Sequence, residues 1–443
     1  MFVESLPLPI LSNVLMWLPA DERPRAALVC RRFRDALQDG GVVWSSVDFS
    51  QSKASRLSDR LLQRVAAKAG AHLTRLNLGE WVTMRQLDGQ AVVFSTDVVL
   101  GVVRSASSLR SLTVFTSVGV ECPLALVRRL VAAAPQLVAL ETDVHAPTAE
   151  EACAFLRNDA PFGAVRLRRL RASFYGGAGG VQFATDGLKA VTAQLVSRHH
   201  VFLRELAVES HSFAVPGAFN ALVDALVPRR MAGLSFTGCL PAARDIVRLL
   251  LGCSLSRLVI KNTRYVLFQT NDSALSLAAA LRVCCTLTSL TLSAVGLWRS
   301  PSRFSTLVAS LVGHPSIRAL DLGGNHVDKH SDIVGTQLAR LIAANAPALT
   351  TLLLSGRNLG DAGLFPLFRA LPGNTFLREL DCSNDYGADI SCVARRMLDA
   401  VRANSALMAL RLGNSSYKEL YPAYSASAEA VVTARAAAAA AAQ

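Results

Sequence analysis

The sequence predicts an α/β solenoid, in which short parallel strands alternate with helices along one extended core. Two observations lead to this fold class. The pattern Leu-x-x-Leu-x-Leu recurs between residues 73 and 412, and segments with a helical spacing of apolar residues lie between its copies. The chain has 443 residues, of which 51% are hydrophobic and 18% charged. It is therefore too long for one compact core and too apolar to be disordered.

The copies of the pattern start about thirty residues apart, near the long end of the range for leucine-rich repeats. In one copy, the alternation of Leu320 and Leu322 fits a strand with one buried face, and Ile317 packs where that strand begins. We expect about twelve such repeats. They start at Leu73, Leu109, Leu137, Leu167, Leu203, Met231, Leu255, Leu287, Ile317, Leu349, Leu377 and Leu407.

The segments between the copies have the period of helices, as in Leu338, Leu341 and Ile342. Each unit then supplies one strand and one helix, whose apolar faces are buried only against the next unit. Pro347 stands two residues before a strand start, where a helix must already have ended. We therefore expect residues 51–413 to form a leucine-rich-repeat horseshoe, with a concave parallel sheet and convex helices.

From Leu287 onward, the copies resemble the ribonuclease-inhibitor-like class of leucine-rich repeats. That resemblance implies a side chain that hydrogen-bonds the backbone just after the strand. Asn325 occupies this position, and Cys239 fits its usual alternative. The corresponding residues of other copies do not fit: Arg357, Asp385 and Ser415.

Three segments interrupt or follow the repeats. Long gaps within residues 79–97 and from Ser173 to Gln182 are expected to be outward loops. The second is rich in glycine but lacks the helix-opening context of a phosphate-binding loop. Residues 414–443 end in an alanine run with no apolar pattern that would dock it, so we expect a loose C-terminal tail.

Residues 1–50 form a separate helical module. Leu8, Leu11 and Leu15 share one face of a helix, and a second helix begins at Pro24, which is acceptable in a first turn. So short a module cannot bury all its apolar side chains internally, so either the solenoid or another protein must cover one face. The pattern alone leaves open a cap for the first repeat and a docking module.

The module resembles the F-box over almost its whole length. The similarity rests on the order Leu6-Pro7, Ile10-Leu11, Trp17-Leu18-Pro19, Ala27 to Phe33 and Val43-Trp44. The departure is Arg23-Pro24, where the family more often has an apolar residue. The resemblance implies a small three-helix F-box that docks on a Skp-type adaptor, and through it on a cullin. By match to the motif, the adaptor-binding residues are Leu6, Pro7, Ile10, Leu11, Leu28, Val29, Phe33 and Trp44.

The concave sheet face is the expected binding surface for a target protein, because strand positions two, four and six after the first Leu project from the core. Charges of both signs alternate along it, which suits a protein partner. Despite the net charge of +13, this pattern disfavours nucleic acid, which requires continuous basic surface. For any one residue, a solvated face without a ligand is the alternative. The candidates are Arg75, Phe115, Glu141, Asp143, Arg169, Arg171, Glu205, Glu209, Arg257, Lys261, Asp321, Glu379, Asp381 and Arg411.

No catalytic motif occurs in the sequence, so we expect neither enzyme activity nor a cofactor. His326 and His330 are four residues apart but follow a strand in a loop, and no metal site is predicted. Nine irregularly spaced cysteines indicate a reducing compartment, the cytoplasm with the nucleus as the alternative, and are expected to be small buried side chains. No run of about twenty apolar residues predicts a membrane-spanning helix.

The sequence favours a substrate-recognition subunit of a Skp–cullin–F-box ubiquitin ligase, with the F-box on the adaptor and the concave face on an unidentified target protein. The alternative is a ribonuclease-inhibitor-like scaffold that binds protein without a ubiquitin role, with its N-terminal helices serving only as a cap. Co-purification with a Skp-type adaptor distinguishes the two.

Overall fold

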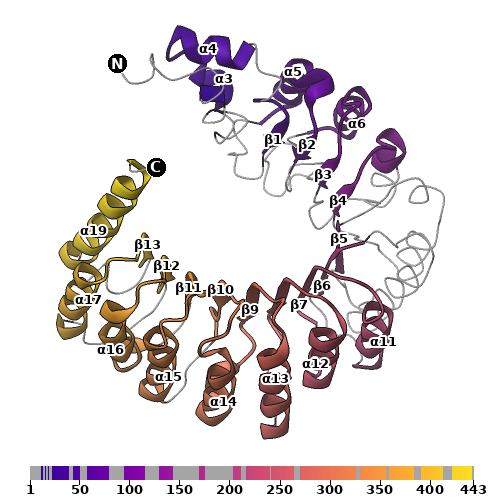
Figure 1. The fold of residues 1–443 in the computed structure, drawn as a ribbon. Helices are drawn as coiled ribbons and strands as arrows, with labels where there is room; N and C mark the ends of the chain where they lie inside the picture. Colours follow the sequence, from indigo (N-terminus) through magenta and orange to yellow (C-terminus); the bar gives the residue numbers. More distant parts are fainter. Residues whose placement is uncertain are drawn as a thin grey trace, which may run out of the picture. The chain divides into compact units, whose positions relative to one another are not determined.

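The computed structural model describes most of the chain and divides it into two compact units, Met1–Ala214 and Val215–Gln443, each described here by itself. In both units, parallel strands alternate with helices (Figure 1). The described residues are 11–12, 15, 18, 22–38, 43–49, 57–78, 94–114, 129–142, 169–174, 203–210, 216–239, 241–263, 270–325, 330–355, 359–383, 391–412 and 422–441.

The first unit contains a parallel sheet whose strands pair in sequence order. Ser58 and Ser95 cap two of its helices, because their side chains accept hydrogen bonds from the Leu61 and Val98 amides. The strands are β1 (Ser46–Asp48), β2 (Arg75–Asn77), β3 (Ser111–Val114), β4 (Ala139–Thr142), β5 (Arg169–Phe174) and β6 (Glu205–Ser210). The helices are α3 (Arg23–Ala26), α4 (Arg31–Gln38), α5 (Asp59–Ala69), the 3-10 turn η2 (Gly70–His72) and α6 (Thr96–Ser105).

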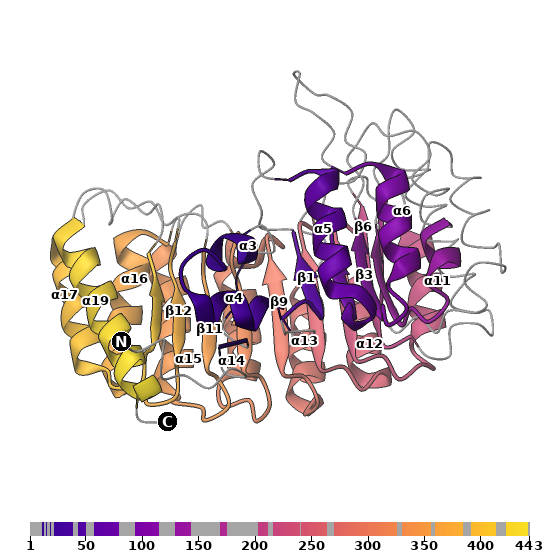
Figure 2. The same ribbon diagram turned by 90° about the horizontal axis from the view of Figure 1, so that it is seen from above.

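The second unit repeats this arrangement, with its helices side by side along one face of the parallel sheet (Figures 1 and 2). Its strands are β7 (Gly233–Thr237), β8 (Arg257–Lys261), β9 (Ser289–Ser293), β10 (Ala319–Asp321), β11 (Thr351–Leu353), β12 (Glu379–Asp381) and β13 (Ala409–Arg411). Its helices are α11 (Pro216–Leu226), α12 (Ala243–Gly252), α13 (Asn271–Val283), η5 (Leu297–Arg299), α14 (Pro301–Leu311), α15 (Ser331–Ala343), α16 (Gly360–Ala370), η6 (Leu371–Gly373), α17 (Ser391–Ala403) and α19 (Pro422–Ala441).

The predicted solenoid is confirmed, since each of the twelve predicted copies forms a strand that begins two residues after its predicted start. The central leucines of neighbouring copies stand in register and are fully buried, as Leu290, Leu320 and Leu352 show. Burial of such a continuous apolar row drives the stacking of one repeat on the next. The predicted helical leucines of α15, such as Leu338, are buried as well.

The strand β1 was not predicted, and it precedes the first copy. Its segment reads Trp44-Ser-Ser-Val47-Asp-Phe49, with all three named side chains at most 1% exposed. Since Val47 pairs with Leu76 of β2, these residues take the places of the three leucines in an additional repeat. The first repeat therefore begins inside the segment assigned to the F-box.

Asn325 performs the backbone-bonding role predicted for it. Its side chain, with no exposed surface, donates to the carbonyl oxygens of Leu292 and Leu322 at 2.7 and 2.8 Å. Its Oδ1 accepts from the amides of Val295 and Leu297 at 3.0 and 3.1 Å. These four bonds join two successive turns after the strands. The Sγ of Cys239, the predicted alternative, donates to the Thr237 carbonyl oxygen at 3.6 Å.

A second set of buried polar side chains, which the sequence did not predict, ties each helix exit to the preceding repeat. His314, Asn374 and Asn404 each stand five residues before the first residue of a strand, in β10, β12 and β13 respectively. They contact the carbonyl oxygens of Leu281, Ile342 and Leu371 respectively, at 2.8 to 2.9 Å. They satisfy backbone acceptors that the end of a helix leaves without partners.

Helices α15 and α16 approach closely because each carries a glycine at the contact. A Cβ atom built on Gly335 would overlap the backbone of Gly363. Any side chain at Gly335 would therefore force these two helices apart.

The alanine-rich end of the chain is not loose, and that prediction is wrong. It forms α19, which packs on α17 and β13, and its Ala428 and Val432 are buried. Arg435 donates to the carbonyl oxygens of Leu407 and Val401 at 2.7 and 3.2 Å. Since α19 packs on the last strand, it covers the apolar end that a solenoid must close. Of the two predicted loops, residues 79–93 and 175–182 lie outside the described residues.

Replacing Arg435 with alanine is expected to destabilise this terminal helix by about 1–2 kcal/mol, because two partly buried carbonyl oxygens lose a charged donor. Hydrogen exchange of α19 should become faster while exchange of β9 and β10 stays unchanged. Arg402→Ala, an exposed change on α17, is the control. Unchanged exchange of α19 in the Arg435 variant would show that apolar packing alone holds the helix.

Candidate functional site

The N-terminal module is organised around Arg23, the first residue of α3. This side chain is only 2% exposed. Its Nε donates to the Leu18 carbonyl oxygen at 3.0 Å, and its Nη1 donates to those of Val43 and Ser46, both at 2.8 Å. Burial lowers the pKa of Arg23 to about 10, and Asp48 opposes this shift. The residue that departs from the F-box pattern thus joins the helices to the start of β1.

Trp44 lies in the core of the module and not on its surface. Its indole nitrogen donates to the Leu37 carbonyl oxygen at 3.0 Å, which holds the end of α4. The Arg23 guanidinium and the Lys68 ammonium group lie 5.7 and 5.9 Å from the ring centroid, within cation–π range. Since Lys68 belongs to α5, Trp44 connects the module to the first repeats.

The turn between α3 and α4 exposes the two large apolar side chains that the F-box resemblance assigns to the adaptor contact. Leu28 and Val29 are 79% and 72% exposed. The Leu28 and Val29 amides donate to the carbonyl oxygens of Arg25 and Ala26, which fixes the turn. Two adjacent exposed apolar residues of this size are typical of a protein contact.

The other predicted adaptor-binding residues are placed differently. Phe33 is half-buried. Leu11, at 1% exposed, and Trp44 are buried, so the prediction that Leu11 enters an adaptor groove is not supported by its position. Leu6, Pro7 and Ile10 lie outside the described residues.

In the first unit, Arg75 of β2 is exposed, and Glu205 and Glu209 of β6 are half-buried on the sheet face away from the helices. The registers place Arg169 beside Glu205. Glu141, Arg169 and Arg171 lie in β4 and β5, as predicted, but their side chains lie outside the description. So do the whole residues Phe115 and Asp143.

In the second unit, part of the predicted binding charge is used within the protein. Arg411 and Glu379 form an ion pair at 2.8 Å. The Oδ1 atoms of Asp321 and Asp381 accept from the amides of Gly323 and Ser383, so both carboxylates close turns at strand ends. Asp381 is only 7% exposed, which corrects its assignment as a projecting side chain.

Two basic residues of β8 remain available on this face of the second unit. Arg257 is exposed and Lys261 is half-buried. The two residues are four apart in the strand, so their side chains lie on the same face of the sheet. The centre of the face, in β9 and β10, carries small side chains such as Ser289, Ala319 and Thr291. A basic strand beside these small side chains and the half-buried Asp321 of β10 can bind a protein surface.

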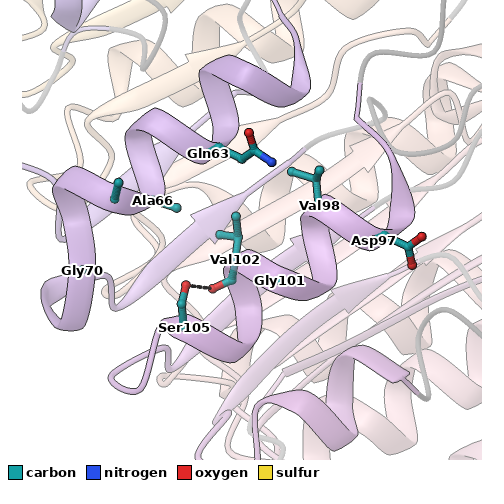
Figure 3. A pocket seen from close by; sticks show the side chains of 9 residues that line it. Gln63, Ala66, Gly70, Asp97, Val98, Gly101, Val102 and Ser105 are labelled. Carbon is teal, nitrogen blue, oxygen red and sulfur yellow. Dashed lines mark hydrogen bonds between the residues drawn. The ribbon is translucent and has the colours of Figure 1, made fainter.

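A groove of about 560 Å³ between α5 and α6 is lined by small and apolar residues (Figure 3). Gly101 and Ala66 leave the space open, and the Ser105 hydroxyl is bonded to the Val102 carbonyl oxygen. The carboxylate in its lining, Asp97, pairs with Arg129 at 3.4 Å. The groove is therefore mainly packing surface, with the Gln63 amide as its further polar group.

Of the six cysteines that the structure describes, four are buried, as expected, and Cys30 is half-buried. Cys239, Cys253, Cys284 and Cys382 are buried, whereas Cys285 is exposed and departs from that prediction. Burial raises the pKa of the Cys253 thiol to about 11, which disfavours the reactive thiolate at neutral pH.

The described residues also bear on a metal and a membrane. They include no group of three or more potential metal ligands. Of the histidine pair considered in the sequence, His330 precedes α15, and His326 lies outside the description. Among the described helices, none is long and apolar enough to cross a membrane.

Comparisons with known proteins agree with this geometry. A profile of F-box-like domains matches residues 3–50. The yeast Rad7 structure, solved as a complex with Elc1, aligns with a TM-score of 0.54 at 16% identity, over 89% of each chain. Two weaker similarities have TM-scores too low to inform the fold. The actin-binding site 2 of leiomodin-1 aligns at 0.31 (15% identity, 36% of this chain and 86% of that one). The C-terminal domain of Caenorhabditis elegans tropomodulin aligns at 0.29 (18%, 38% and 92%).

No curated protein sequence matches the chain. The chain thus has an F-box-like domain at residues 3–50, followed in the sequence by an α/β solenoid of strand–helix repeats. The F-box-like domain associates it with ubiquitin-ligase adaptors, and the Rad7 likeness extends over both parts of the chain.

Proposed function

We propose that this protein is the substrate-recognition subunit of a Skp–cullin–F-box ubiquitin ligase. The F-box-like domain docks on a Skp-type adaptor, which links it to a cullin, and the helix-free sheet face holds the target protein. The protein contributes proximity between target and ubiquitin-conjugating partner, not a catalytic group. It works in the cytoplasm, the compartment that its cysteine use favours, with the nucleus as the alternative.

The observation that carries the proposal is the F-box-like domain at residues 3–50, with Leu28 and Val29 exposed at its surface. A plain solenoid cap has no need of two adjacent exposed apolar side chains, because its apolar residues close the first repeat. Here the strand β1 and Trp44 already provide that closure. The exposed apolar side chains of this turn are therefore available to contact another protein. Rad7, which shares the fold, was also crystallised with a protein partner, Elc1.

The test is capture of a purified Skp-type adaptor by the full chain. Leu28→Asp with Val29→Asp is expected to weaken capture at least tenfold, because buried apolar anchors dominate interface energies. The matched control is Leu275→Asp with Val283→Asp on α13. This control also replaces one leucine and one valine. Their side chains are 57% and 65% exposed, and they are distant in the sequence from the F-box-like domain.

Equal capture by the two double variants would contradict docking through this turn. Absence of any adaptor binding by the unchanged chain would favour the alternative function, a protein-binding scaffold without a ubiquitin role. Affinity purification of the full chain beside a version lacking residues 1–50 then separates target proteins, retained by both, from ligase components, which are lost.

A further inference from the structure

A second candidate surface lies on the helical side of the second unit. A groove of about 890 Å³ runs between α16, α17 and α19, and nine residues line it. Three of them are exposed arginines: Arg369 from α16, and Arg395 and Arg396 from α17. Tyr424 of α19, which is half-buried, supplies its aromatic surface, and the buried Phe368 lies beneath. The groove thus combines a strong positive charge with an apolar floor.

The charge of this groove is not consumed by the fold. Among the described residues, none forms an ion pair or hydrogen bond with Arg369 or Arg395, and Arg396 lies 4.4 Å from the centroid of the Phe365 ring. Nearby arginines behave differently: Arg378 donates to the Ala406 carbonyl oxygen, as Arg435 does to that of Leu407. Those arginines hold the last repeats together, whereas the three in the groove serve no such bond within the described residues.

The directions of the three side chains favour an extended ligand over a single anion. Arg395 and Arg396 are consecutive on a helix, so their side chains leave the axis about 100° apart. Arg369 approaches from the neighbouring helix. Three guanidinium groups that diverge along a groove match a row of carboxylates better than one phosphate group. Each guanidinium presents a planar fork of donors that fits a carboxylate.

We propose that the groove between α16, α17 and α19 binds an acidic peptide segment of a partner protein. Its Asp and Glu carboxylates pair with Arg369, Arg395 and Arg396, while its backbone lies over Tyr424. Recognition of acidic segments by arginine clusters is an established mode of peptide binding. Asp399 is the one acidic residue of the lining. It repels a peptide carboxylate placed beside it, which restricts the registers in which the peptide can bind. The groove belongs to the second unit and shares no residue with the F-box-like domain, so the proposal does not depend on the proposed ligase role.

The test measures binding of a fluorescent twelve-residue peptide with six glutamates to the full chain, by anisotropy at 0.15 M salt. Arg369→Glu with Arg395→Glu is expected to weaken binding at least tenfold. The control variant, Arg282→Glu with Arg402→Glu, makes the same charge change at exposed arginines outside the groove. It should weaken binding less than twofold. Circular dichroism compares the folding of both variants, and Arg369→Gln replaces the double variant if that protein unfolds.

Several outcomes would overturn the proposal. Failure of the unchanged chain to bind the peptide is one, and an equal loss in the two double variants, which would indicate only overall charge, is another. Displacement of the peptide by millimolar inorganic phosphate would identify a simple anion site. Tighter, arginine-dependent binding of an oligouridine probe would instead assign the groove to RNA.

Discussion

Replacing Asn325 with alanine is expected to destabilise the second unit by about 3–4 kcal/mol. The change leaves two carbonyl oxygens and two amides without partners in a place that water does not reach. Each buried polar group without a partner costs about 1–3 kcal/mol, although the surrounding turn relaxes and recovers part of the loss. The effect should appear where the bonds are, in the turns that follow β9 and β10.

Hydrogen exchange provides the local measurement, because the amides of Val295 and Leu297 donate to Asn325. Their exchange should become faster by about 100- to 700-fold, since each 1.4 kcal/mol corresponds to a factor of ten. Asn271→Ala is the control, because Asn271 is exposed and accepts from the exposed Arg303. Equal protection of Val295 in the Asn325 variant would contradict the structural role.

An intermediate variant tests the chemistry of the position. Asn325→Cys keeps a weak donor of the kind that Cys239 provides in an earlier repeat. It should be less destabilising than alanine but worse than asparagine, because a thiol replaces only one of the four bonds. A cysteine variant as stable as the natural protein would indicate that shape, not hydrogen bonding, is required at this site.

Replacing Arg23 with methionine is expected to destabilise the N-terminal module by about 2–4 kcal/mol. The carbonyl oxygens of Leu18, Val43 and Ser46 would lose a charged donor. Methionine preserves much of the side-chain volume and avoids the cost of burying a charge, which reduces the loss. Arg23→Lys should be similarly destabilising, because one ammonium group lacks the planar fork that reaches several acceptors.

The measurement is protection of the Phe49 amide, which donates to the Asn77 carbonyl oxygen at 2.8 Å and reports on the pairing of β1 with β2. Arg25→Met, an exposed change on the same helix, is the control. Because the pKa of Arg23 is about 10 and its usual value is higher still, the side chain is charged in both states near neutrality. The difference between variants should therefore be the same at pH 6 and pH 8, and a strong pH dependence there would point to another group.

Much of the fold could be predicted because the core residues of a repeat protein recur at a regular interval along the sequence. Leu290 and Leu320 belong to the same pattern, and a period of about thirty residues with alternating apolar positions is sufficient to place strand after strand. The helix-exit residues His314, Asn374 and Asn404 were not predicted, because such a polar side chain is found at this place in only three of the repeats whose helix exits the structure describes. Their common distance from the strand start was the available indication.

The candidate sites were predicted less well. The strand period gives the face on which a side chain lies, but it does not show whether a neighbouring residue forms an ion pair or hydrogen bond with that side chain. The strand period predicts that Glu379, Asp381 and Arg411 project from the sheet. Pairing of Glu379 with Arg411, and the bond from the Ser383 amide to Asp381, depend on adjacent strands and turns. The arginine groove between α16, α17 and α19 was invisible for the same reason, since its residues come together only when the helices pack.

The sequence by itself determined the repeating unit, the register of its strands and the F-box-like character of the first fifty residues. Only the tertiary structure determined which apolar residues near the two ends of the chain are buried and what covers them. The position of Trp44 in the sequence fits both an F-box and a repeat. In the structure, β1 follows Trp44 and pairs with β2, and Trp44 is buried in the core. The alanine run matches no apolar pattern, yet α19 docks because the last repeat leaves an apolar face to cover. A local pattern records which side chains avoid water, whereas only the folded chain determines what covers them.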